Sequence, residues 1–243
     1  MSDGVLPAGG RAVLTDIEGT TTAVAFVYDV LFPYAAARLD AFCAAPPADD
    51  SDAAQALARL AAEHREEASH VPPPAGLPPF GDGAPYARYL MARDRKSTGL
   101  KQLQGAIWER GYRDGTLRGH VFPDVPPALA AWTAAGVRLR VFSSGSVRAQ
   151  KLLFAHTDFG DLAGHFEGFH DTTTGPKLEP ASYAAIAAAF ALPPAAVLFL
   201  SDYTGELDAA AAAGLRTGCL LRPGNAPADP GPHPTYHSFA ELT

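Results

Sequence analysis

The sequence is 243 residues long, which is enough for one large domain or for one core that carries an insertion. Hydrophobic residues make up 47% of the chain and charged residues 19%, proportions that are ordinary for a soluble globular protein. The formal net charge of −7, with no run of Lys and Arg, argues against nucleic acids and anionic membranes as partners.

The sequence favours a cytoplasmic protein. No stretch approaches the length of a membrane span, and residues 1–10 lack the charged segment and apolar run of a secretory signal. The two cysteines, Cys43 and Cys219, lie far apart in the sequence and form no metal-binding spacing. If the ligand is a phosphate, its attraction to this acidic chain must be local, from a metal ion, a lysine or backbone N–H groups.

After an expected loose lead-in over residues 1–10, a short apolar run predicts a buried strand that ends at about Asp16. Asp16 and Glu18 lie one residue apart at this end, and Gly19 permits the chain to turn there. Ligands bind at the carboxyl ends of strands in an open α/β sheet, and Mg²⁺ takes oxygen ligands. The two acids therefore indicate a site for a hard cation, the alternative being a solvated acidic turn.

The pattern of apolar residues changes after the first strand, and over residues 23–120 it predicts a mostly helical insertion. Apolar residues recur there at helical spacing, as at Phe26, Val27 and Val30, and no strong strand pattern lies between them. The stretch 71–85 is rich in Pro and Gly, and we interpret it as a connection between helices. The alternative is a recognition segment for a partner.

After Pro123, predicted helices and strands alternate along the chain. Gly136 and Gly214 follow two of the predicted helices, at the position where glycine commonly ends a helix. We expect helices at 125–135, 146–156, 182–190 and 206–213, and strands at 137–142, 166–170, 196–201 and 216–221. Such alternation predicts an α/β fold with a parallel sheet and right-handed crossovers, to which the first strand also belongs.

Three later sites carry polar residues that could perform chemistry. Ser143 and Ser144 end a predicted strand and precede a helix, so their hydroxyls and the helix N–H groups could hold an anion. Lys177 lies in a loop before a helix, and Asp202 ends the apolar strand 196–201. The plain alternatives are an N-cap, a solvated lysine and an acid that caps the next helix. Residues that end parallel strands are expected to converge at one edge of the sheet.

The stretch Asp16-Ile17-Glu18-Gly19-Thr20 resembles the first motif of the haloacid dehalogenase superfamily of phosphotransferases, Asp-x-Asp-Gly-Thr. Glu18 departs from the commoner second Asp. The order of Asp, hydroxyl, Lys and Asp along the chain also resembles the four motifs of that superfamily. Segments at 16–22, 26–34, 94–105, 143–154 and 222–225 are similar to its enolase-phosphatase branch. The resemblance covers nearly the whole chain.

This resemblance implies a particular domain organisation. A Rossmann-like core would comprise residues 1–22 and 121–243, and a mostly helical cap would be inserted at residues 23–120. The stretch 44–85 shows little similarity, so the shape of the cap is the least defined part of this expectation.

The resemblance also implies roles for the two acids of the first motif. Asp16 would attack phosphorus and form an aspartyl phosphate. One Mg²⁺ per chain would be held by Asp16, Asp202 and the backbone carbonyl of Glu18. The Glu18 carboxylate would protonate the leaving oxygen and then take a proton from the attacking water.

The other motif residues would bind the substrate. Lys177 and the hydroxyls of Ser143 and Ser144 would contact the phosphoryl oxygens. Glu206 would orient the water ligands of the metal. As a binding partner we expect only a small phosphorylated diketone, with no nucleic acid or membrane, and we expect a monomer.

The implied substrate is 2,3-diketo-5-methylthiopentyl-1-phosphate, which is enolised and then dephosphorylated to the acireductone in methionine salvage. The base for the enolisation stays open, with Glu18, Lys96 and Lys101 as candidates. Apolar residues near Phe26 and Phe32 could surround the methylthio tail, or they could belong to the core.

Three alternatives remain for the function. Another phosphatase of the superfamily would keep the same site residues and differ only in its cap. A dehalogenase would need no metal and no acid at Glu18. A non-catalytic scaffold would be expected to have lost one of Asp16, Lys177 or Asp202, and all three are present.

Overall fold

The computed structural model describes residues 11–46, 51–226 and 229–243. The lead-in expected over residues 1–10 lies outside the described residues. The chain divides into two compact units, the first comprising the chain up to Val27 together with Arg118–Thr243, and the second comprising Tyr28–Leu117. Each unit has its own cluster of buried apolar side chains.

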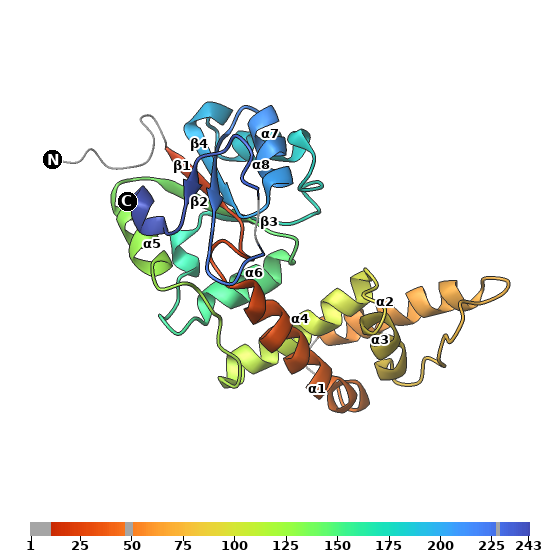
Figure 1. Ribbon diagram of the computed structural model, residues 1–243. Coiled ribbons are helices and arrows are strands. Elements are labelled where there is room, and N and C mark those ends of the chain that lie inside the picture. Colours follow the sequence, from red (N-terminus) through yellow and green to blue (C-terminus); the bar gives the residue numbers. More distant parts are fainter. Residues whose placement is uncertain (1–10, 47–50, 227–228) are drawn as a thin grey trace. The chain divides into compact units, whose positions relative to one another are not determined.

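The first unit is built on a six-stranded parallel sheet with the order β3-β2-β1-β4-β5-β6. Strands β1 to β4 are labelled in Figure 1. The predicted α/β fold with a parallel sheet is confirmed. The pattern did not reveal β6, because a two-residue strand is too short to show a period. The strands are β1 (Ala12–Thr15), β2 (Arg138–Phe142), β3 (Gly168–His170), β4 (Val197–Ser201), β5 (Arg216–Leu220) and β6 (Thr235–Tyr236).

Strand β1 lies in the middle of the sheet, between β2 and β4. Every side chain of β1 and β4 is buried, which explains why both strands read as continuous apolar runs in the sequence. Thr15 pairs with Val141 of β2 and with Leu200 of β4. The three strands therefore end at nearly the same level, and the residues that follow them share one edge of the sheet.

Four helices of the first unit connect its strands, and they lie within about two residues of the predicted spans. These are α5 (Val125–Ala134), α6 (Val147–Ala155), α7 (Pro180–Ala189) and α8 (Thr204–Ala212). Ser146 caps α6 as predicted, because its Oγ accepts the N–H of Ala149 at 3.2 Å. Short 3₁₀ turns lie at Ala163–His165, Pro194–Ala196 and Phe239–Leu242.

The second unit is helical and has no strand over its described residues. A π-helical turn at Phe26–Leu31 crosses the unit boundary and leads into the helices α1 (Phe32–Ala44), α2 (Ser51–Ala68), α3 (Ala84–Met91) and α4 (Thr98–Asp114). Helices α2 and α4 approach closely, since a Cβ on Gly99 would lie 2.7 Å from the backbone N of Leu60. The stretch 71–85 runs from the end of α2 to the start of α3, as predicted. Within the described ranges, no helix is both long and apolar enough to cross a membrane.

Candidate active site

The residues predicted for the site lie together around one hollow of about 190 Å³ in the first unit. All six predicted residues line it, and Glu206 lines it too. The full lining comprises Asp16, Glu18, Val24, Ser143, Ser144, Lys177, Asp202, Tyr203 and Glu206. The expected convergence of strand ends is thus observed, because β1, β2 and β4 end at this hollow.

Asp16 directly follows β1 and keeps the register of the sheet, since its N–H donates to the carbonyl of Leu200 at 2.9 Å. Its carboxylate Oδ1 accepts hydrogen bonds from the N–H of Ile17 at 2.7 Å and from Nζ of Lys177 at 2.9 Å. These two donors offset the cost of burying a carboxylate whose side chain is 8% exposed. Asp16 lines the hollow, so a ligand bound there can contact its carboxylate.

The turn after Asp16 is held by the carbonyl of Ile17, which accepts the N–H groups of Thr20, Thr21 and Thr22 at 2.9–3.2 Å. This compact turn explains the run of small polar residues after the strand. It leaves the Glu18 side chain exposed on the lining of the hollow, two residues from Asp16.

Gly19 is required where the turn passes Asp202. Its φ of +71° is in the left-handed region, and a Cβ there would lie 1.9 Å from Oδ2 of Asp202. Asn225 joins the two segments, because its Nδ2 donates to the Gly19 carbonyl at 2.8 Å and to Asp202 Oδ2 at 3.1 Å. The Asp202 carboxylate is therefore fixed against the backbone of the first motif.

Lys177 is a buried cation between two acids. Its Nζ lies 2.9 Å from Asp16 Oδ1 and 2.7 Å from Glu206 Oε2. Burial disfavours the charged amine, but the carboxylates of Asp16 and Glu206 outweigh this effect and raise the pKa of Lys177. The lysine is therefore protonated at neutral pH and positioned to attract an anion. The Tyr183 hydroxyl fixes its backbone by donating to the Lys177 carbonyl at 2.7 Å.

Two of the acids that line the hollow have a raised pKa. Burial and the nearby charge of Asp16 raise the pKa of Glu206 to about 7, against the lowering effect of Lys177. Burial and the Asp16 charge likewise raise the pKa of Asp202 to about 6. Burial is the larger cause of both shifts, and the charge of Asp16 adds to it. Four carboxylates and a single lysine line the hollow.

This donor set fits a divalent cation. Asp16 and Asp202 both line the hollow and offer the carboxylate oxygens that Mg²⁺ prefers, and the charge of the ion would offset the excess of carboxylates. Over the described ranges, no group of three or more His, Cys, Asp and Glu side chains is arranged to hold a metal. A Mg²⁺ site does not need such a group, since Mg²⁺ usually keeps several waters and takes one or two carboxylates.

Ser143 and Ser144 form the side of the hollow next to the start of α6. Ser143 is buried and its Oγ accepts the N–H of Gly145 at 3.2 Å, whereas Ser144 is exposed. The buried Gln150 shapes this loop, because its Nε2 donates to the carbonyls of Gly145 at 2.7 Å and His170 at 2.8 Å. Sequence reasoning gave Gln150 no role, although it lies in the segment 143–154 that resembled the enolase-phosphatase branch.

Arg222 is a second buried residue that sequence reasoning left without a role. Its Nε donates to the Thr20 carbonyl at 2.9 Å, and its Nη1 pairs with Asp124 Oδ2 at 2.8 Å. Arg222 and Asn225 belong to the segment 222–225 that resembled the enolase-phosphatase branch. Both bind the turn of the first motif, so this segment positions that turn.

The structure also places the remaining predicted residues. Phe26 is buried and stacks on His120 with ring centroids 5.8 Å apart, and Phe32 packs against Trp108 with centroids 6.3 Å apart. The core interpretation therefore holds for Phe26. Lys96 and Lys101 are exposed and belong to the second unit.

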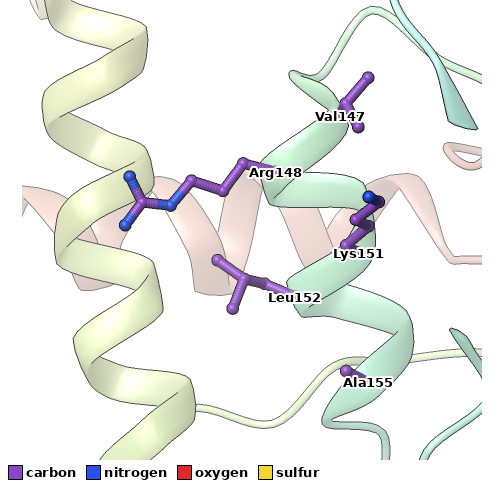
Figure 2. Close-up of a pocket in the computed structure, with 5 residues that line it drawn as sticks. All are labelled: Val147, Arg148, Lys151, Leu152 and Ala155. Carbon is purple, nitrogen blue, oxygen red and sulfur yellow. The ribbon is translucent and has the colours of Figure 1, made fainter. Parts of the chain in front are cut away.

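A larger hollow of about 410 Å³ lies along one face of α6 (Figure 2). Arg148 and Leu152 extend to the same side of this helix in Figure 2. The lining comprises Val147, Arg148, Lys151, Leu152 and Ala155. It contains no carboxylate and none of the predicted site residues, all of which line the smaller hollow.

Comparison with known proteins gives consistent matches over nearly the whole chain. A family model for haloacid dehalogenase-like hydrolases matches residues 11–214. Enolase-phosphatase E1 from Synechococcus elongatus is 51% identical over 238 residues, covering 98% of this chain and 99% of that protein. Enolase-phosphatase E1 from Pseudomonas aeruginosa is 50% identical over 232 residues, covering 96% of this chain and 97% of that protein.

A solved structure is also similar. The UTR4 protein from Saccharomyces cerevisiae superposes with a TM-score of 0.77 at 33% sequence identity, covering 95% of this chain and 98% of that one. These matches confirm the resemblance that the motifs indicated. The chain therefore belongs to the haloacid dehalogenase-like hydrolases and, within them, to the enolase-phosphatase E1 family.

Proposed function

We propose that this chain is a Mg²⁺-dependent enolase-phosphatase that converts 2,3-diketo-5-methylthiopentyl-1-phosphate to the acireductone and phosphate in methionine salvage. The observation that carries the proposal is the buried pair of Lys177 and Asp16, 2.9 Å apart, in a hollow that Glu18 and Asp202 also line. A nucleophilic carboxylate, a fixed cation and a second acid are the groups that phosphoryl transfer through an aspartate needs. The roughly half-identical relatives named enolase-phosphatase support the choice of substrate.

Asp16 and Glu18 carry the two phosphoryl-transfer steps. A bond forms between Asp16 Oδ2 and phosphorus while the bond from phosphorus to the C1 oxygen breaks, and the leaving oxygen takes a proton from Glu18. A water molecule then gives a proton to Glu18 and attacks phosphorus, which releases phosphate and restores the Asp16 carboxylate. The proton that Glu18 donates in the first step is thus recovered in the second.

Lys177 and the serine loop bind the phosphoryl group. The protonated Lys177 offsets the charge of the phosphoryl oxygens, and its two carboxylate partners fix its position before the substrate arrives. The Ser144 hydroxyl is exposed on the hollow and can donate directly. Ser143 supports the same loop through its bond to Gly145.

Asp16, Asp202 and the backbone carbonyl of Glu18 would hold the Mg²⁺, which when bound neutralises phosphoryl charge and favours attack by an anion. Asn225 and Gly19 would keep the Asp202 carboxylate in place for this task. Glu206 would act through Lys177, to which its carboxylate is paired.

Enolisation requires a base for the proton on the carbon beside a carbonyl. Glu18 is the candidate that lines the hollow, and Lys96 and Lys101 remain candidates from the second unit. We further propose that residues 23–120 form the cap domain of this enzyme and that residues 1–22 and 121–243 form its core domain. A monomer in the cytoplasm remains our prediction.

The test measures phosphate release and acireductone formation from the diketo substrate, beside a panel of sugar phosphates. We expect turnover of the diketo substrate with Mg²⁺, none in excess chelator, and recovery when Mg²⁺ is restored. Full activity in chelator would contradict the role of the metal. If the protein hydrolyses a sugar phosphate but not the diketo substrate, it is a phosphatase, and the proposed substrate is wrong.

A further inference from the structure

Two large apolar side chains are exposed beside the candidate active site. Leu178 is 57% exposed and directly follows Lys177, and Tyr203 is 55% exposed and directly follows Asp202. Scattered apolar residues on a surface need no explanation, but a pair beside a ligand-binding hollow can mark a binding surface.

Leu178 and Tyr203 lie over the same glycine. A Cβ on Gly205, in the first turn of α8, would lie 3.1 Å from Cε1 of Tyr203 and 3.3 Å from Cδ2 of Leu178. The two side chains, which come from different loops, are therefore neighbours that lie against the start of α8. We call Leu178 and Tyr203 the apolar rim.

The apolar rim is continuous with the hollow. Tyr203 itself lines the hollow, and Val24 is the other apolar residue of the lining. The rest of the lining is carboxylate, ammonium or hydroxyl, which suits a phosphoryl group and not a hydrocarbon or thioether chain. A substrate with one charged end and one apolar end would thus find both chemistries within one connected surface.

We propose that the apolar rim of Leu178 and Tyr203 is the subsite for the apolar, thioether-bearing end of the substrate. This inference rests on the proposed function, because it assigns a part of that substrate to a part of this site. An aromatic ring is a favourable partner for a sulfur atom, and Leu178 adds apolar area beside it. The first unit would then contribute to substrate selection through the residues that directly follow Lys177 and Asp202.

The test compares two substrates that differ only in the tail. One is the diketo phosphate with its methylthio group, and the other is the analogue that lacks this group. The readout is the ratio of kcat/KM for the two compounds in the wild type and in the variants Tyr203→Ala and Leu178→Ala. The matched control is Phe159→Ala, because Phe159 is also apolar and 51% exposed but does not line the hollow.

We expect the wild type to prefer the tailed substrate, and each rim variant to lower the ratio by about tenfold, the low end of what a hydrophobic pocket discriminates. The change should appear mainly in KM, since contact with an unreacting tail is made equally before and during reaction. Phe159→Ala should keep the wild-type ratio. Tyr203→Phe should keep most of it, because the aromatic ring is retained.

Other outcomes overturn the inference in distinguishable ways. A rim variant that loses the same factor on both compounds would show that the residue supports the phosphoryl site, not the tail. If the wild type has equal kcat/KM for both compounds, the tail subsite is rejected, but the proposed phosphatase activity is not. A wild type that releases phosphate from neither compound would reject the proposed function, and the subsite with it.

Discussion

The first unit buries polar side chains around its strand ends, whereas the helical unit buries apolar side chains almost throughout. Among the described residues, the buried polar side chains of the helical unit are Ser97, Gln104 and Glu109. The first unit buries Asp16, Lys177, Glu206 and Arg222, together with several threonines and serines. Buried charges are costly unless they are paired, so the gathering of Asp16, Lys177 and Glu206 at one hollow indicates a site kept for chemistry.

This difference predicts how substitutions should behave. In the first unit, replacing one polar side chain should change catalysis or ligand binding far more than folding. In the helical unit, replacing an apolar side chain should change stability, because packing is what its buried residues supply. The following experiments test that division, from the largest expected effect to the smallest.

Asp16→Asn should have the largest effect. The amide keeps the shape of the side chain but cannot attack phosphorus, so turnover should fall by at least roughly 10³-fold. The melting temperature should change little. Steady-state phosphate release checks this, with the exposed Asp158→Asn as the matched control. Activity within tenfold of the wild type would remove Asp16 from the role of nucleophile.

Glu18→Gln should lower turnover by roughly 10²- to 10⁴-fold, the usual range for acid–base catalysis. Mg²⁺ affinity should persist, because the backbone carbonyl of residue 18 is retained. An aryl phosphate with a low-pKa leaving group needs little protonation, so its first step should be partly rescued and give an initial burst. If the variant is equally slow with both leaving groups and shows no burst, Glu18 does not protonate the leaving oxygen and serves enolisation or the structure of the site.

Lys177→Ala should cost on the order of 10²-fold in kcat/KM, because a fixed cation beside developing charge in a buried site is worth several kcal/mol. Lys151→Ala is the control, since Lys151 is exposed on α6 and lines the larger hollow. Similar losses in the two variants would mean that Lys177 acts only through the general charge of the protein.

The sequence could predict the fold class and the residues that end the strands, since both depend on local patterns. Asp16, Ser143 and Asp202 each follow an apolar strand, and parallel strands must bring such residues to one edge. Lys177 follows no strand, and only its place in the order of the motifs indicated it.

The residues that hold the site in place could not be predicted in the same way. Asn225 and Gly19 are 206 positions apart in sequence, and their hydrogen bond depends on how the loop after β5 folds back. The bond from Arg222 to Thr20 is of the same kind. A local pattern carries no information on such pairs, and the pairing of Glu206 with Lys177 was missed for the same reason.

Asn225→Ala should weaken Mg²⁺ binding by about tenfold, the low end of what second-layer partners of metal ligands contribute. The substitution removes the donor that holds Asp202 Oδ2 and the Gly19 carbonyl together. Calorimetric titration with Mg²⁺ measures this without substrate. An unchanged affinity would show that Asp202 needs no support from this loop.

Leu103→Ala should have the smallest effect on the site and the largest on stability. Leu103 is fully buried in the core of the helical unit, and such truncations cost about 2–5 kcal/mol of unfolding free energy. Denaturant unfolding measures this loss. The Mg²⁺ affinity of the folded variant should match that of the wild type. A marked change in affinity would contradict the claim that packing in the helical unit affects stability and not the site.

The most direct test of the account is to identify the residue that carries the phosphoryl group during turnover. The Glu18→Gln variant is mixed with an aryl phosphate and Mg²⁺, quenched in acid within the burst, digested and mapped by mass spectrometry. We predict one phosphoryl group on the peptide that contains Asp16, and none when Asp16→Asn is added. A phosphoryl group on another residue, or a burst of product with no modified peptide, would contradict the central role of Asp16.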